Sequence, residues 1–137
     1  MVEFALVTMV LLVVTFGGFE FDRMLMAYTS LANAARVGVR YAIVHGSTRT
    51  ATGDAASGAT DTSNVVTAVR SYAKLGFLTA NNVTVTVDYP ASSDPTVDPG
   101  NAPGSTVIVS VSYAYDPLTW LPLRPTLKST SRGVIVF

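Results

Sequence analysis

The stretch Phe4–Phe19, with the sequence FALVTMVLLVVTFGGF, decides the architecture of this chain. It contains no ionisable side chain and is bounded by Glu3 and Glu20. A helix that is hydrophobic on every side has to be buried in lipid or against other protein. The stretch is slightly short for a membrane span, which takes about 20 apolar residues.

The helical pattern continues beyond Glu20. An apolar face recurs there at intervals of three or four residues and comprises Leu25, Tyr28, Ala32, Ala35, Val39 and Ala42. No proline occurs before Pro90, and Gly46 is a favourable residue just past a helix C-terminus. We therefore predict a single helix from about Glu3 to His45, which would be about 64 Å long.

Gly17 and Gly18 are the weak point of this predicted helix. Each glycine in a helix interior costs about 1 kcal/mol relative to alanine. We therefore expect a bend, or a loss of helical hydrogen bonds, near this pair.

The charged residues at the two ends of the apolar stretch have predicted roles in assembly. Glu20 and Arg23 are three residues apart, so their side chains can pair on the helix surface. We expect the Glu3 carboxylate to be buried among helices and satisfied by an N–H donor, most simply the N-terminal ammonium of its own or an adjacent subunit. The predicted assembly residues are Glu3, Phe4, Leu11, Leu12, Gly17, Gly18, Glu20 and Arg23.

The rest of the chain predicts a small polar domain. A second helix should begin after Thr62 or Ser63 and end at Gly76. Its predicted buried face is formed by Val65, Val66, Val69, Tyr72 and Ala73. Alternating apolar and polar residues predict strands over Val83–Tyr89, Val107–Tyr115 and Leu127–Phe137. The expected fold class is α+β, with a long N-terminal helix, one shorter helix and an antiparallel sheet of about three strands.

These elements suggest two domains. Residues 1–45 form the long helix, with a hydrophobic membrane or filament-core segment at 1–23 and an amphipathic half at 24–45. Residues 46–137 form an exposed α+β head, and its first part, residues 46–64, reads as a long polar loop.

The composition argues against several classes of function. Nine basic and nine acidic residues give no net charge and form no Lys/Arg-rich run, so we expect no nucleic-acid partner. The absence of cysteine excludes disulfides, thiolate metal sites and a cysteine nucleophile. With one histidine and no catalytic motif, the chain is expected to be neither an enzyme nor a cofactor or metal protein.

Several isolated residues receive structural interpretations. His45 is expected to stabilise the end of the helix, where a cation suits the helix dipole. Asp94-Pro95 and Asp98-Pro99 read as turns rather than cation ligands. Tyr113, Tyr115 and Trp120 are interpreted as packing residues rather than a binding patch. Asn82-Val83-Thr84 fits the short and common motif for glycosylation of Asn82.

Three N-terminal motifs go beyond hydropathy. They are Glu3-Phe4-Ala5-Leu6, Glu20-Phe21-x-Arg23 and Asn33-Ala34-Ala35-Arg36-x-Gly38-x-Arg40-Tyr41-Ala42. In these motifs the chain resembles the TadE-like pilins of tight-adherence (Flp-type) type IV pilus systems. The segment Val109-x-Val111-x-Tyr113-x-Tyr115-x-Pro117-Leu118 is also similar to that family.

The resemblance implies a particular pathway of maturation and assembly. A pilin of this type is made with a basic leader, inserted in the inner membrane, and cut after a glycine by a prepilin peptidase. The glutamate of the family pattern is the fifth mature residue, and Glu3 matches it. Assembly machinery in the inner membrane then packs the helix into a filament that is extruded outward. The resemblance implies no cofactor.

The predicted function is therefore a structural subunit that polymerises with itself into an extracellular pilus used for surface attachment. In this interpretation Leu11, Leu12 and Val13 lie inside the filament, and an inner-membrane pool precedes assembly. Two alternatives remain open from the sequence. One is a minor pilin or pseudopilin that primes assembly, and the other is a periplasmic binding module whose helix is only a membrane anchor.

Overall fold

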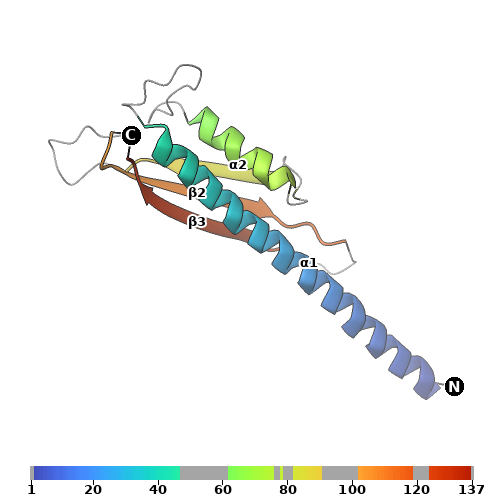
Figure 1. Ribbon diagram of the computed structural model, residues 1–137. Coiled ribbons are helices and arrows are strands. Elements are labelled where there is room, and N and C mark those ends of the chain that lie inside the picture. Colours follow the sequence, from blue (N-terminus) through green and yellow to red (C-terminus); the bar gives the residue numbers. More distant parts are fainter. Residues whose placement is uncertain are drawn as a thin grey trace.

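The computed structural model describes residues 2–46, 62–75, 78, 82–90, 102–118 and 124–136. Two helices precede three strands along the chain (Figure 1). They are α1 (Val2–Val44), α2 (Ser63–Leu75), β1 (Val83–Asp88), β2 (Thr106–Ala114) and β3 (Thr126–Val134). The predicted α+β class, with a long helix, a shorter one and a three-stranded antiparallel sheet, is confirmed.

Helix α1 runs without interruption through Gly17 and Gly18, so the expected loss of helical structure at this pair is wrong for the single chain. Adding one residue to a formed helix gains a hydrogen bond, whereas a break leaves backbone groups on both sides unpaired. The helical hydrogen bonds on either side of the pair therefore outweigh the low helix propensity of two glycines. The boundaries Val2 and Val44 agree with the predicted ones to within one residue.

The three strands form one antiparallel sheet in the order β1-β2-β3. In its register Val85 pairs with Val111, and Val111 pairs with Ser129. Because side chains alternate across a strand, Val107, Val109, Val111 and Tyr113 of β2 point to one face and are buried. The opposite face carries hydroxyl and charged side chains, including Thr86, Ser110, Lys128 and Arg132.

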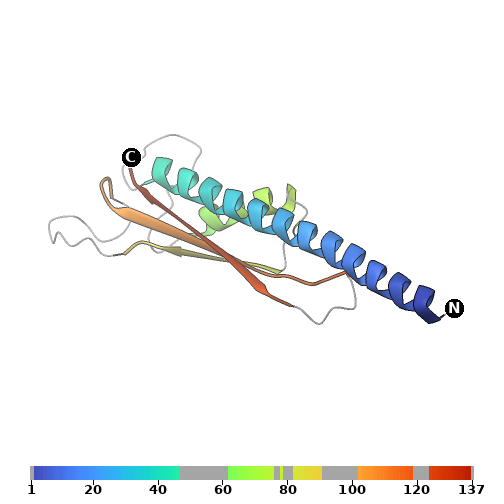
Figure 2. The ribbon, with the colours of Figure 1, turned by 90° about the horizontal axis from the view of Figure 1, so that it is seen from below.

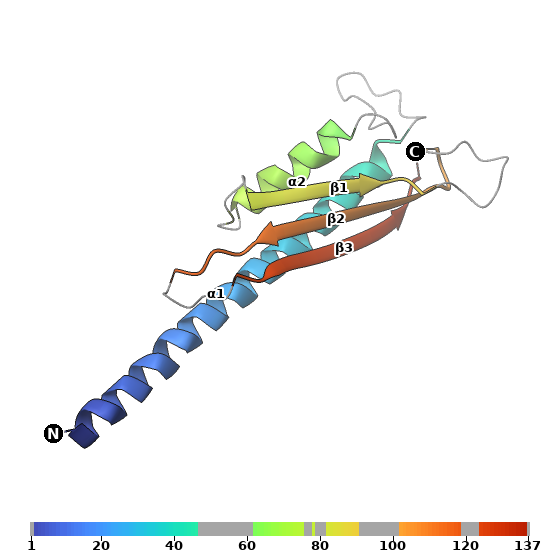
Figure 3. The same ribbon diagram turned by 180° about the vertical axis from the view of Figure 1, so that it is seen from behind.

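Both helices cover the same face of this sheet (Figure 2). The view from behind shows the three strands in front of α2 and the second half of α1 (Figure 3). One apolar core joins the two layers, and α1 contributes to it Ala27, Leu31, Ala34, Ala35, Val39 and Ala42. The folded head is therefore built partly from the second half of α1, while the first half extends beyond the sheet.

Helix α2 packs its apolar face against α1 and β1. Val65, Val69 and Ala73 are buried, as the sequence predicts, and the carbonyl of Thr62 accepts the first helical hydrogen bond from Val66 at 3.0 Å. Val66 and Tyr72 differ from the prediction, because Val66 is half-buried and Tyr72 is 36% exposed.

The closest approaches between layers occur at two glycines. A Cβ atom at Gly38 of α1 would collide with a Val69 methyl group of α2 and lie 3.1 Å from Val109 of β2. A Cβ atom at Gly133 of β3 would lie 2.6 Å from Val39 and Ile43 of α1. Glycine at these positions therefore sets the distance at which α1 lies on α2 and on the sheet.

The predicted last strand is shorter than expected, since β3 ends at Val134 rather than Phe137. The chain still remains bonded beyond it. The Ile135 amide donates to the Ser105 carbonyl at 2.9 Å, and the Val136 amide donates to the Ile43 carbonyl at 3.2 Å. The last contact satisfies a carbonyl at the C-terminal end of α1, where no further helical amide is available.

Some sequence predictions fall on residues outside the described ranges. These are most of the polar loop 46–64, the turns at Asp94 and Asp98, the packing of Trp120, and Phe137.

Candidate functional site

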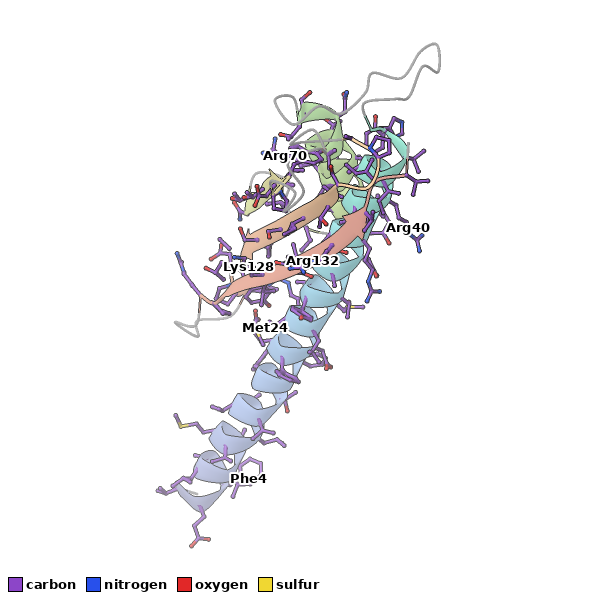
Figure 4. All side chains as sticks on the ribbon, turned by 90° about the vertical axis from the view of Figure 1, so that its left-hand side faces the viewer. Phe4, Met24, Arg40, Arg70, Lys128 and Arg132 are labelled. Carbon is purple, nitrogen blue, oxygen red and sulfur yellow. The ribbon has the colours of Figure 1, made fainter. Side chains whose placement is uncertain are left out.

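The first half of α1 is an apolar surface with no protein covering it in the single chain. Phe4 is 79% exposed, Leu11 62% and Leu12 49%. Phe4 projects from the end of α1 far from the sheet (Figure 4). Within the part of the chain that the structure describes, α1 is the one helix long and apolar enough to cross a membrane. We call residues 2–19 the apolar half.

The apolar half and the head meet at Glu20. The Glu20 side chain is only 12% exposed, and Arg23 lies one turn further along α1. The distance between Arg23 Nη1 and Glu20 Oε1 is 3.7 Å, which confirms the predicted pairing of these two side chains. Ala27 is the first buried residue of α1, so the boundary between the uncovered and covered parts of the helix lies close to this pair.

The segment after β2 binds this boundary. The Tyr115 hydroxyl donates a hydrogen bond to Glu20 Oε1 at 2.5 Å, and the Leu118 amide donates to the same oxygen at 3.3 Å. Arg23 Nη1 in turn donates to the Asp116 carbonyl at 3.4 Å. The Arg23 guanidinium carbon lies 5.5 Å from the centroid of the Tyr115 ring, within the range of a cation–π interaction. We call Glu20, Arg23 and Tyr115, with the backbone of Asp116 and Leu118, the collar.

Electrostatics in the collar favour a protonated Tyr115. Burial raises the pKa of Tyr115 to about 12, and the hydrogen bond and negative charge of Glu20 act in the same direction. Arg23 opposes the shift with a smaller effect. The phenol is therefore a hydrogen-bond donor to Glu20 at every physiological pH.

Two cavities lie on either side of Tyr115. One, of about 350 Å³, is almost wholly apolar and is lined by Gly17, Glu20, Phe21, Met24, Tyr115, Pro117 and Pro125. The other, of about 440 Å³, has a more polar lining and includes Arg23, Met26, Ala27, Thr29, Ser30, Leu78, Tyr113 and Tyr115. Both open where the apolar half of α1 enters the head, so a partner lying along that half would meet them.

The predicted assembly residues do not form a single cluster. Glu3, Phe4, Leu11 and Leu12 are exposed along the apolar half. No atom lies within 4 Å of where a Cβ of Gly17 or Gly18 would be, apart from neighbouring residues and their own helix. Among the predicted residues, Glu20 and Arg23 are brought together with the head. The burial predicted for Leu11, Leu12 and Glu3 concerns the assembly and stays a prediction.

Sequence reasoning missed the role of Tyr115 and Leu118 in the collar. Strand alternation places Tyr115 on the buried face, where its ring is indeed only 4% exposed. It does not indicate that the hydroxyl reaches a carboxylate 95 residues earlier. A tyrosine at the end of a buried strand face was the available signal, because a buried phenol normally needs a hydrogen-bond partner.

The remaining candidate residues are His45 and Asn82. His45 stacks on Tyr41 with ring centroids 3.8 Å apart, and its Nδ1 lies 2.8 Å from the Tyr41 carbonyl oxygen. Asn82 is exposed just before β1. The described segments contain no group of three or more histidine, aspartate or glutamate side chains that could hold a metal ion.

This arrangement defines a class of protein in which one long helix has an uncovered apolar half and packs its other half into a small α+β head. The comparison with protein families then gives a specific relationship. Residues 1–40 match the family described as TadE-like protein, so the resemblance expected from the N-terminal motifs is confirmed for that segment. The match covers less than half of the chain, and the matched segment includes the apolar half of α1, which by length and composition could cross a membrane. Neither the curated proteins nor the solved structures contain a match to this chain.

Proposed function

We propose that this protein is a structural subunit of a Tad-type pilus and polymerises through the apolar half of α1. The observation that carries the proposal is the exposure of that half over its whole circumference, on a helix that continues directly into a folded head. Residues 2–19 lie at the filament axis, and the head lies outside. The proposal assigns the protein no catalytic activity.

The physical argument rests on the size of the uncovered surface. Soluble monomers rarely expose contiguous apolar patches larger than a few hundred Å². A membrane covers this surface before assembly, and the helices of other copies cover it in a filament. Contacts between two different surfaces of the same chain do not have to close into a ring, so they can propagate into a helical polymer.

The family match at residues 1–40 and the exposed helix support the partners that we propose. The chain resides in the inner membrane until a prepilin peptidase and the assembly machinery of the pilus act on it. It then becomes part of an extracellular filament that attaches the cell to surfaces.

Shearing of filaments from cells that produce the protein tests this function. Electron microscopy should show filaments in the released material, and mass spectrometry should identify this chain as its dominant protein. Leu12→Asp, which places a charge in the apolar half, should abolish filaments. Thr86→Asp, on the exposed face of β1, should leave them unchanged.

Other outcomes would replace the proposal. A chain found only as a trace component of filaments built from another protein would be a minor pilin. A chain that stays in the inner-membrane fraction while wild-type cells release no filaments containing it would be a tethered module.

A further inference from the structure

We propose that Glu3 of one subunit pairs with Arg23 of a second copy that is displaced along the helix axis by about 30 Å, so that its first helical turns occupy the cavity beside Arg23. This inference rests on the proposed polymerisation and specifies its register. The occupant of the cavity is the start of the apolar half of another copy of this chain.

Charge complementarity is the first argument. Glu3 is the only charged residue of the apolar half, it is exposed, and within the described residues no hydrogen bond or ion pair engages its carboxylate. Packing α1 among other apolar helices without a cation for Glu3 would leave an uncompensated buried charge. The terminal ammonium, which the sequence predicts as this cation, belongs to residue 1, outside the described ranges.

Arg23 is the first basic residue after Glu3 along α1. Its side chain remains 48% exposed, and its contacts to Glu20 and to the Asp116 carbonyl are long, at 3.7 and 3.4 Å. A guanidinium has five N–H donors, so Arg23 can keep its contacts in the collar and also donate hydrogen bonds to a further carboxylate. It therefore offers a cation fixed at the border of the apolar half.

Helix geometry places the two charges on opposite sides of α1. Twenty residues separate them, which at 3.6 residues per turn is a rotation of about 200° and a rise of about 30 Å. Two parallel copies that contact each other through different faces need their complementary groups on opposite sides. The pair Glu3–Arg23 meets this requirement, and a shift along the axis brings one charge level with the other.

The cavity on the Arg23 side is suited to the residues that follow Glu3. Val7 and Val10 lie four and seven positions after Glu3, on the same side of the helix. With Glu3 level with Arg23, they lie level with Ala27 and Ser30, which line this cavity of about 440 Å³. Met26 and Leu78 supply apolar surface there, while Arg23 faces the carboxylate.

The consequence is a defined axial register. Valine and leucine side chains along the apolar half accept many offsets between neighbouring helices. One charge at the start of the helix and one at its border with the head select a single offset, because any other offset leaves the Glu3 carboxylate without a cation.

Charge reversal tests the pairing in cells whose wild-type protein forms filaments. Glu3→Arg alone and Arg23→Glu alone should each lower the filament yield about tenfold or more. The double variant Glu3→Arg/Arg23→Glu should restore most of the yield, because it recreates the pair with opposite polarity. Equal loss in the double variant and the single variants would overturn the pairing.

Disulfide trapping provides a second test that needs no charge rescue. The natural chain has no cysteine, so Val10→Cys/Ser30→Cys introduces the only thiols while it keeps the charges of Glu3 and Arg23. The two positions are about 30 Å apart on one helix, so any bridge between them joins two copies. Mild oxidation of membranes and filaments should give a ladder of covalent dimers, trimers and longer chains.

Val10→Cys/Arg40→Cys is the matched control, since Arg40 is exposed on α1 but lies about 15 Å beyond Ser30. A ladder of equal intensity in both variants, or none in the first, would refute the register. Absence of filaments in the wild type would instead refute the proposed function, so the two failures can be distinguished.

Discussion

The Tyr115 hydroxyl lies 2.5 Å from Glu20 Oε1 and joins residues that are 95 positions apart in the chain. This contact joins the end of the β2 face to α1 where the apolar half ends. The contact therefore lies at the boundary between the uncovered part of α1 and the part that packs on the sheet.

Replacing Tyr115 by phenylalanine should destabilise the head by about 1–3 kcal/mol, because the largely buried Glu20 carboxylate loses a donor while the ring remains. Chemical denaturation of the full chain in detergent micelles, followed by tyrosine and tryptophan fluorescence, measures the difference. Tyr28→Phe is the control, since Tyr28 lies on α1, as Glu20 does, and is 47% exposed. Equal stabilities of the two variants would contradict the role of the collar.

The raised pKa of Tyr115 predicts a pH dependence at high pH. The folded pKa is about 12, above the ordinary value of 10.0, so folding favours the protonated phenol. This contribution to stability should be fully present below pH 10 and lost as the pH rises toward 12. The stability difference between the wild type and Tyr115→Phe should therefore shrink over this interval, and a difference that is constant from pH 8 to 12 would contradict it.

Gly38→Ala should destabilise the head by about 1–3 kcal/mol, because the added methyl group overlaps Val69 and crowds Val109 where α1 meets α2 and β2. Gly18→Ala is the matched control in the same helix, since nothing lies within 4 Å of its added methyl group. That control should stabilise the isolated chain by about 1 kcal/mol through helix propensity. Thermal unfolding in micelles compares the stabilities of the two variants. A Gly38→Ala variant as stable as Gly18→Ala would show that α1 can move away from α2 and the sheet without a loss of stability.

A chain that begins at residue 24 should fold into a soluble head, whereas one that begins at residue 46 should not. The shorter chain lacks Leu31, Ala35 and Val39, which are buried in the core that α1 shares with α2 and the sheet. Amide dispersion in NMR spectra of the two fragments measures this directly. A folded fragment 46–137 would show that the sheet and α2 suffice for a core.

Glu3→Ala should impair filament assembly while leaving the protein in the membrane. The variant removes the only charge of the apolar half, so insertion into lipid becomes no harder, but the register between copies loses its determinant. Membrane fractionation and filament yield measure the two properties separately. A wild-type yield of filaments from Glu3→Ala would contradict a role for this carboxylate.

Several elements were accessible from the sequence because they depend on local patterns. Periodicities of 3.6 and 2 residues located α1, α2 and the strands, and the spacing of Glu20 and Arg23 predicted their pairing. The N-terminal motifs indicated the TadE-like family, whose model matches residues 1–40. The length of β3 and the continuity of α1 at Gly17 and Gly18 were predicted less well, since hydrogen bonding by neighbouring residues decides both.

The sequence by itself determined that the chain has an apolar helix start, an amphipathic continuation and a small α+β head, because each follows from the order of side chains along a few turns or one strand. Only the tertiary structure decided that Tyr115 and Leu118 meet Glu20, and that Gly38 lies against Val69. Such contacts join residues far apart in sequence, and they depend on how two elements cross, which no local periodicity encodes.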